Sequence, residues 1–80
     1  MVFTYIIKSL KDGNHYVGMT QDVQKRLAQH NAGRVRSTQH RRPFVLVCVE
    51  AHPTRAEART REKFLKSYKG AKEKYQLIGR

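Results

Sequence analysis

The chain has 80 residues, of which 17 are Lys or Arg and six are Asp or Glu, so its formal net charge is +11 at neutral pH. That length predicts one small domain over residues 1–80, with a thin hydrophobic core, and leaves no room within it for a recognition domain beside a catalytic one. A charge of this size favours partners that carry phosphate, and nucleic acid is the leading class.

The remaining composition favours a folded protein in the cytoplasm. Seven aromatic residues and a hydrophobic fraction of 39% are enough for a core. No apolar run approaches the roughly 20 residues of a membrane span, so no membrane partner is expected. The single cysteine, Cys48, excludes an internal disulfide and is typical of a reducing compartment. We expect a monomer.

The first 20 residues predict a β-hairpin. Residues 2–8 are rich in β-branched and aromatic side chains, which favours a strand. Residues 11–14 contain Asp12, Gly13 and Asn14, which favour a tight turn. Residues 15–19 then form the returning strand.

A helix, a basic loop and a third strand are expected next. Thr20 or Asp22 can cap a helix that runs to about residue 31, with Gly33 ending it. Residues 32–42 form a loop with four arginines. Residues 44–49 follow Pro43 and are apolar on both faces, which predicts a central strand covered by helices on at least one side.

Two helices complete the predicted fold. Thr54 and Glu57 have the spacing of a capping box, so a helix should begin there and run to about Tyr68 or Lys69, ending near Gly70. Apolar residues at positions 71, 75 and 78 predict a short final helix. The order ββαβαα predicts an α+β fold, a small, mainly antiparallel three-stranded sheet flanked by helices in a sandwich-like arrangement.

Ionisable side chains lie on the apolar stripes of both longer helices. In the first helix His30 follows Leu27 by three residues on the inward stripe, and Arg26 borders that stripe. In the second helix Glu62 lies between Ala58 and Leu65. An inward carboxylate is costly unless it is paired, protonated or bound to a metal. The pattern therefore suits a functional site better than a core.

The hairpin supplies two tyrosines to the same region. Tyr5 and Tyr16 lie mid-strand on paired strands, so we expect them to be cross-strand neighbours. Gly18 follows Tyr16 by two residues on the same face, which leaves open space beside that phenol.

Each of these residues also has an ordinary structural explanation. A strand tyrosine is commonly a core residue with a hydrated hydroxyl. His30 near a helix end can complement the macrodipole, and Arg26 can extend along the surface. Glu62 can pair across the helix surface with one of three cations, Arg59, Arg61 or Lys66.

Taken together, the sequence resembles the GIY-YIG endonuclease superfamily over nearly its whole length. Residues 3–5 (Phe-Thr-Tyr) stand where the first triplet of the family lies, and residues 16–18 (Tyr-Val-Gly) where the second lies. The helix with Arg26 and His30 and the capped helix with Glu62 complete the pattern. The sequence is most similar to the small single-domain bacterial members, the UPF0213-like proteins.

The resemblance implies an endonuclease that hydrolyses DNA with one divalent ion, Mg²⁺ or Mn²⁺. Glu62 would hold the metal, and Arg26 would offset charge on the phosphoryl oxygens. Tyr5 would deprotonate the attacking water, Tyr16 would orient water or phosphate, and His30 would accept or relay the proton. DNA is preferred over RNA as partner, with little sequence specificity and a role in DNA repair or recombination.

The expected phosphate-contacting residues are basic and lie on several predicted elements. They are Lys8, Lys25, Arg34, Arg36, Arg41, Arg42, Lys63 and Lys66.

Two other functions remain open at this point. Many family members have an asparagine late in the domain, whereas no asparagine follows Asn31 here. A non-catalytic DNA- or RNA-binding module that keeps the fold is therefore one alternative. An accessory subunit that docks on a repair or replication protein is the other.

Overall fold

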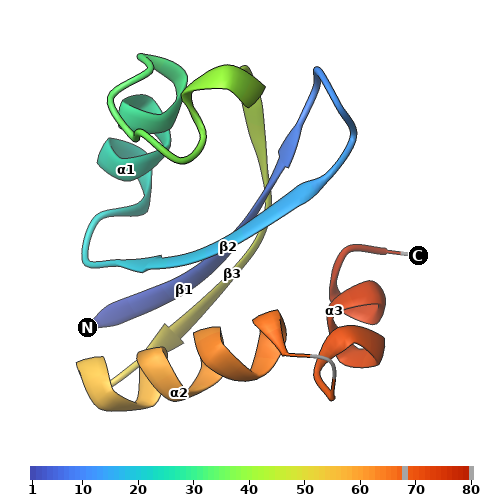
Figure 1. Ribbon diagram of the computed structural model, residues 1–80. Helices are drawn as coiled ribbons and strands as arrows, with labels where there is room; N and C mark the ends of the chain where they lie inside the picture. The colour runs from blue at the N-terminus through green and yellow to red at the C-terminus, as the bar shows by residue number, and fades with distance from the viewer. Residues whose placement is uncertain (68, 80) are drawn as a thin grey trace.

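The computed structural model describes residues 1–67 and 69–79, which form a small sheet with helices on both sides (Figure 1). The elements in chain order are β1 (Val2–Ser9), β2 (His15–Thr20), α1 (Val23–Asn31), the short 3₁₀ helix η1 (Gln39–Arg41), β3 (Phe44–His52), α2 (Arg55–Lys66) and α3 (Ala71–Leu77). The predicted α+β class and the order ββαβαα are confirmed, and β1 pairs antiparallel with both other strands.

The strand order β2-β1-β3 puts the hairpin strand β1 in the centre, so the prediction that the third strand is central was wrong. Val45, Leu46 and Val49 of this edge strand remain about 40% exposed. An apolar run indicates that both faces of a strand are covered by other elements. It does not indicate whether the strand is hydrogen-bonded to neighbouring strands along one edge or both. Here α1 and α2 both contact β3, although β3 pairs with only one neighbour among the described strands.

Two hydrophobic clusters lie on opposite sides of the sheet because successive residues of β1 point to opposite faces. Tyr5 and Ile7 pack with Phe44 on the side of α1. Ile6 packs with Val17 and Leu65 on the side of α2. The central strand therefore carries both clusters, which explains why residues 4–7 are all buried.

Helix α1 begins and ends at sequence signals. The Asp22 side chain accepts a hydrogen bond from the Lys25 backbone N–H at 3.0 Å, so Asp22 rather than Thr20 is the N-cap. Gly33 follows the C-cap with a φ of +78°, a conformation that favours glycine. These two signals place Arg26 and His30 on the side of the helix that the sequence predicted.

Helix α2 begins as predicted and ends earlier than predicted. Thr54 accepts a hydrogen bond from the Glu57 N–H at 3.2 Å. The helix stops at Lys66, because the Ser67 hydroxyl donates to the Phe64 carbonyl and satisfies a group at the helix end. Of the two residues predicted to end it, Tyr68 lies outside the described residues and Lys69 lies in a turn.

None of the helices among the described residues has the length and hydropathy needed to span a bilayer.

Replacing Leu65 with alanine should destabilise the protein strongly. Leu65 is 1% exposed and joins α2 to the Ile6 cluster, so the substitution should cost about 3 kcal/mol through lost burial and a cavity. Urea unfolding followed by circular dichroism measures this. The same change at Leu10, which is 59% exposed, should cost less than about 0.5 kcal/mol. Equal effects at both positions would contradict the packing described here.

Candidate functional site

Three aromatic side chains from β1, β2 and α1 meet on the α1 side of the sheet. The ring centroids of Tyr5 and Tyr16 are 6.4 Å apart, and the His30 ring lies 5.9 Å from Tyr5 and 5.1 Å from Tyr16. The strand register pairs Tyr5 with Gly18 and Tyr16 with Ile7. The two tyrosines are therefore cross-strand neighbours, as expected, in a diagonal arrangement.

Gly18 is required by the position of the Tyr5 hydroxyl. A Cβ atom at residue 18 would lie 2.5 Å from Tyr5 Oη and 3.1 Å from Cε2 of Tyr16. Both distances are shorter than normal carbon contacts, so a side chain at this position would displace the phenol. Glycine thus lets the Tyr5 ring cross over β2 towards the edge of the sheet.

The Tyr5 hydroxyl continues into a buried chain of hydrogen bonds. Tyr5 Oη is 2.9 Å from Nε2 of His30, and Nδ1 of His30 is 2.7 Å from Oγ1 of Thr38. The Thr38 hydroxyl in turn donates to the Val35 carbonyl. His30 and Thr38 are both fully buried.

These partners define the protonation of His30. Burial, with a smaller contribution from the charge of Arg26, lowers the pKa of His30 to about 4, so the ring is neutral at physiological pH. Because the Thr38 proton is used by the Val35 carbonyl, Thr38 accepts from the His30 Nδ1–H. The lone pair of Nε2 is then free to accept the proton of the Tyr5 hydroxyl.

Arg26 and Glu62 approach the same hydroxyl from opposite helices. Burial raises the pKa of Tyr5, a hydrogen bond from Arg26 opposes this shift, and the charge of Glu62 adds to it. Tyr5 Oη donates to His30 Nε2, and the charges of Arg26 and Glu62 act on the same phenol. The Arg26 guanidinium also donates to Gln29 Oε1 at 3.0 Å, which fixes its direction along α1.

Glu62 has one of the three cationic partners that the sequence allowed. Its carboxylate accepts from Lys66 Nζ at 3.1 Å, and that ammonium lies 5.6 Å from the Tyr16 ring centroid. The Glu62 side chain is 16% exposed and that of Lys66 is 48% exposed. Arg61 turns to the other side of α2, where it forms ion pairs with Glu50 and Glu73.

Glu62 is the residue of this site suited to a divalent metal ion. No group of three or more His, Cys, Asp or Glu side chains with metal-binding geometry exists among the described residues. Mg²⁺ commonly binds through one or two carboxylates and completes its shell with water and substrate phosphate. The residues present fit an ion of that kind held by Glu62.

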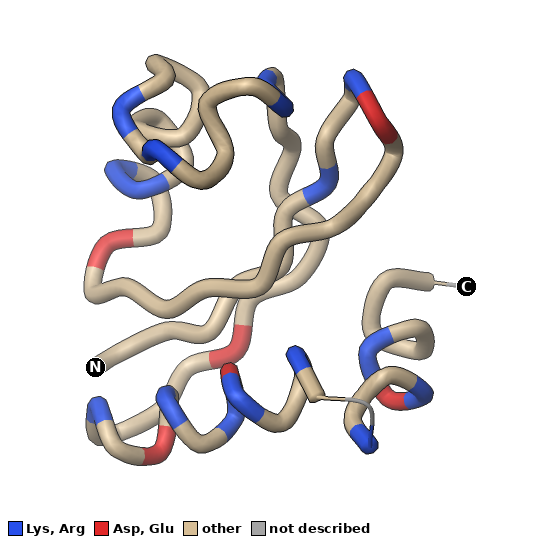
Figure 2. The backbone as a smooth tube through the Cα atoms, viewed as in Figure 1, with Lys and Arg blue, Asp and Glu red and all other residues tan. Residues whose placement is uncertain are grey.

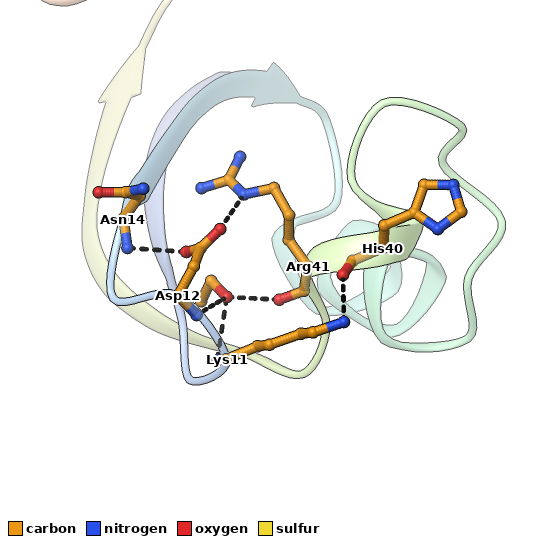
Figure 3. Close-up of polar contacts among 6 residues, drawn as sticks. Lys11, Asp12, Asn14, His40 and Arg41 are labelled. Carbon is orange, nitrogen blue, oxygen red and sulfur yellow. Dashed lines mark hydrogen bonds and ion pairs between the residues drawn. The ribbon is translucent and has the colours of Figure 1, made fainter.

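The basic loop between α1 and β3 is fixed to the tip of the hairpin (Figure 3). Lys11 Nζ donates to the His40 carbonyl at 3.1 Å, and Arg41 Nε donates to Asp12 Oδ2 at 2.9 Å. The Ser9 hydroxyl donates to the Arg41 carbonyl. The backbone N–H of Asn14 and, next, the Arg41 side chain lower the pKa of Asp12. Arg41 therefore has a structural partner.

The other predicted phosphate-contacting residues are spread over several elements of the chain. Figure 2 shows Lys and Arg on the loop, on both longer helices and near the hairpin tip. Lys8 pairs in register with His15 at the hairpin, and Lys66 neutralises Glu62. The exposed members of the predicted set are Lys8, Lys25, Arg34, Arg36, Arg42, Lys63 and Lys66.

Comparison with known proteins assigns the family. A family model described as the GIY-YIG catalytic domain matches residues 1–76, a span that includes every residue of the site above. The chain belongs to the GIY-YIG family. This is a nuclease superfamily, so membership supports an endonuclease-like function and a nucleic acid substrate.

Individual GIY-YIG relatives match over most of their own length. The UPF0213 protein SSP2268 of Staphylococcus saprophyticus is 40% identical over 77 residues, which cover 95% of this chain and 92% of that protein. The UPF0213 protein SH2523 of Staphylococcus haemolyticus is 42% identical over 67 residues, covering 82% and 80%. The solution NMR structure of the UPF0213 protein BH0048 of Bacillus halodurans superposes with a TM-score of 0.57 at 35% identity, covering 99% of this chain and 87% of that one.

Two residues that position the GIY-YIG site were missed by the sequence interpretation. Thr38 has no local signal, because its role depends on the imidazole eight residues earlier. Asn31 uses its amide to accept from the Phe44 N–H at 2.7 Å and to donate to the Phe44 carbonyl at 3.1 Å, which holds the end of α1 on β3. Its place directly after His30 is the only sequence signal.

A larger cavity elsewhere in the GIY-YIG domain does not belong to this site. It has a volume of about 640 Å³ and lies between α2, α3 and the end of β3, lined by Phe64 and Arg61 among others. Its main cation, Arg61, is neutralised by Glu50 and Glu73, and the walls are largely apolar. Hydrolysis of a charged diester needs polar groups directed at the substrate, and those converge on Tyr5.

Replacing Gly18 with alanine should displace the Tyr5 hydroxyl from His30. The new methyl group overlaps Tyr5 Oη, so we expect a loss of about 1–3 kcal/mol in stability and a change in the His30 ring nitrogen resonances. Urea unfolding and ¹⁵N NMR of the imidazole measure the two effects. Alanine at Gly13, where the new atom meets nothing within 4 Å but φ is +76°, should destabilise without moving the His30 signals. Unchanged His30 signals in the Gly18 variant would refute the close approach.

Stability should fall as the pH drops below about 6.5. Folding lowers the pKa of His30 from 6.5 to about 4, so between these values the unfolded chain binds a proton that the folded chain does not. The stability from the neutral imidazole is complete above pH 6.5 and is lost progressively towards pH 4. Urea unfolding across this range measures the slope.

A His30→Gln variant is the control for this pH dependence. In this variant the free energy of unfolding should depend less steeply on pH. Part of the remaining pH dependence should come from His15, because burial and the neighbouring Lys8 lower its pKa too. Identical slopes in the two proteins would mean that His30 does not titrate as described.

Proposed function

We propose that this protein is a metal-dependent endonuclease that hydrolyses phosphodiester bonds of DNA with little sequence specificity, in repair or recombination. The observation that supports the proposal is that side chains of two helices, His30 and Arg26 of α1 and Glu62 of α2, act on the Tyr5 hydroxyl. His30 accepts its proton across a 2.9 Å hydrogen bond, and the charges of Arg26 and Glu62 act on the same phenol. A purely structural tyrosine needs one hydrogen-bond partner and no cluster of charges.

Tyr5 and His30 act together as the proton acceptor. Tyr5 accepts a proton from the attacking water while its own proton passes to Nε2 of His30 along the 2.9 Å hydrogen bond. Thr38 holds the imidazole in the tautomer that this transfer needs. In the free protein His30 is a weak base, and the charge of Arg26 is one of the two causes. A bound phosphate neutralises Arg26 and so raises the basicity of His30 in the complex.

The remaining residues stabilise charge and position the substrate. Arg26 offsets the negative charge that develops on the phosphoryl oxygens, which a planar guanidinium does through paired hydrogen bonds. Tyr16, packed against His30, orients water or phosphate. Glu62, now paired with Lys66, would hold the divalent ion, Mg²⁺ or Mn²⁺. That ion, when bound, polarises the phosphate and stabilises the leaving oxygen.

Binding of the substrate is mostly independent of the DNA sequence. Exposed cations on the loop and helices contact backbone phosphates, and such contacts carry no base information. Binding should therefore weaken steeply with salt.

A non-catalytic nucleic-acid-binding module is the second candidate. The observation that favours it is the ion pair between Lys66 and Glu62, which occupies the carboxylate proposed to hold the metal. In that case the net charge of +11 provides binding alone.

Cleavage of supercoiled plasmid in Mg²⁺ or Mn²⁺ distinguishes the two candidates. Glu62→Gln should lower the rate by at least about 100-fold because the metal loses its protein ligand, and Tyr5→Phe should do the same because the proton path is broken. Gel separation of nicked and linear products measures the rates.

The matched control is Glu57→Gln, the same chemical change on the opposite side of α2. Glu57 is exposed, and the variant should cut like the original protein. If Glu62→Gln cuts as fast as Glu57→Gln, Glu62 has no catalytic role. No metal-dependent cutting by the original protein, together with salt-dependent binding that survives Glu62→Gln, would favour the binding module.

A further inference from the structure

A polar cleft lies at the end of β2. It adjoins the catalytic cluster, which comprises the site residues Tyr5, Tyr16, Arg26, His30 and Glu62. The cleft has a volume of about 360 Å³ and is bounded by the last residues of β2, the first turns of α1 and the start of α2. Three of its lining residues are cations: Lys25 and Arg26 from α1 and Arg55 from α2. Arg55 was not among the residues that the sequence assigned to phosphate contact.

This cleft is continuous with the catalytic cluster through shared residues. Arg26 lines the cleft, and its guanidinium also acts to lower the pKa of Tyr5 in the cluster. Strand β2 carries Tyr16 and Gly18 in the cluster and Met19 and Thr20 in the cleft wall. A ligand that lies against β2 between the two helices therefore meets both places in turn.

The cations of the cleft lack the neutralising partners that other cations of this protein have. Arg41, Arg61 and Lys66 each form an ion pair with a carboxylate. Within the described part of the chain, no carboxylate forms an ion pair with Lys25, Arg26 or Arg55.

The acidic residue in the cleft wall does not cancel this charge. Asp22 is the one acidic residue among those lining the cleft, and it is held as the N-cap of α1, accepting from a backbone N–H. Three cations against one carboxylate leave a net positive charge. The cleft is therefore suited to an anionic ligand.

The spacing along α2 indicates an extended anion. Arg55 lies seven residues before Glu62, which is about two turns, so both side chains project from the same side of the helix. The rise between them is about 10 Å. A single nucleic acid strand advances about 3.4 Å per nucleotide in a duplex, so this distance corresponds to about three nucleotides.

We propose that the cleft is a second phosphate site, in which Lys25 and Arg55 hold the backbone of the cleaved strand about three nucleotides from the scissile phosphate. It rests on the proposed function, because the strand it holds is the substrate of the neighbouring cluster. The site contacts backbone phosphates and no bases. It positions the strand so that the scissile phosphate lies at Arg26.

Binding of a fluorescein-labelled DNA duplex of about 20 base pairs tests this proposal, measured by anisotropy in EDTA at about 50 to about 200 mM salt. Each phosphate contact contributes about 0.9 to the slope of log K against log salt. Arg55→Gln and Lys25→Gln should each lower the slope by about one, and the double variant by about two. The loss should be the same for unrelated DNA sequences.

The matched control is Lys72→Gln, which removes the same charge from exposed α3, away from the cleft. Its slope should equal that of the original protein. The three residues replaced, Lys25, Arg55 and Lys72, are exposed, so every variant should keep the thermal midpoint of the original protein. If Arg55→Gln and Lys72→Gln lower the slope equally, or if the original protein does not bind at 50 mM salt, the proposal is overturned.

The two proposals fail in different ways in these experiments. In one outcome the protein cuts plasmid while Arg55→Gln and Lys25→Gln leave the slope of log K against log salt unchanged. That result would refute the second phosphate site and leave the proposed nuclease activity intact. A slope that depends on these residues in a protein that does not cut would keep the phosphate site and assign it to a binding module.

Discussion

The hydrogen bond between the Tyr5 hydroxyl and His30 Nε2 is the interaction on which the rest of this small structure depends. It joins the central strand to α1 within the cluster that packs one side of the sheet. A buried imidazole is tolerated only when both ring nitrogens are satisfied, and Thr38 satisfies the second. The same bond accounts for Gly18, since the phenol reaches His30 by lying over a residue without a side chain. Fold and candidate site therefore share one polar contact.

Most of the fold was predictable because its signals are local. The Asp-Gly turn, the Asp22 and Thr54 caps and the alternation within β1 act over a few residues, and the structure has those elements where the sequence places them. The position of β3 at the edge was not predictable. Burial of a face and pairing of an edge are separate properties, and a single apolar run reports only the first. The early end of α2 depends on one side-chain hydrogen bond of Ser67 that composition does not reveal.

For the candidate site, helical spacing identified the side chains that point inward but not their partners. His30 and Glu62 stood out because ionisable groups rarely occupy apolar stripes. Thr38 had no such contrast, because a threonine in a polar loop is ordinary until an imidazole is found beside it. The same limit applies to the charges. Whether an arginine is paired depends on contacts distant in sequence, as between Arg61 and Glu50. The cations that form ion pairs among the described residues therefore could not be told from the others by sequence.

The attachment of the basic loop to the hairpin tip has a consequence for the entropy of substrate binding. Hydrogen bonds from Lys11 and Ser9 and the ion pair between Arg41 and Asp12 restrict the backbone of a segment that would otherwise sample many conformations (Figure 3). Ordering a free loop on a ligand costs roughly 1 kcal/mol or more per residue. Here the end of the loop, at His40 and Arg41, is already held by the hairpin. The hairpin residues therefore reduce the conformational freedom that this end of the loop could lose on binding any ligand.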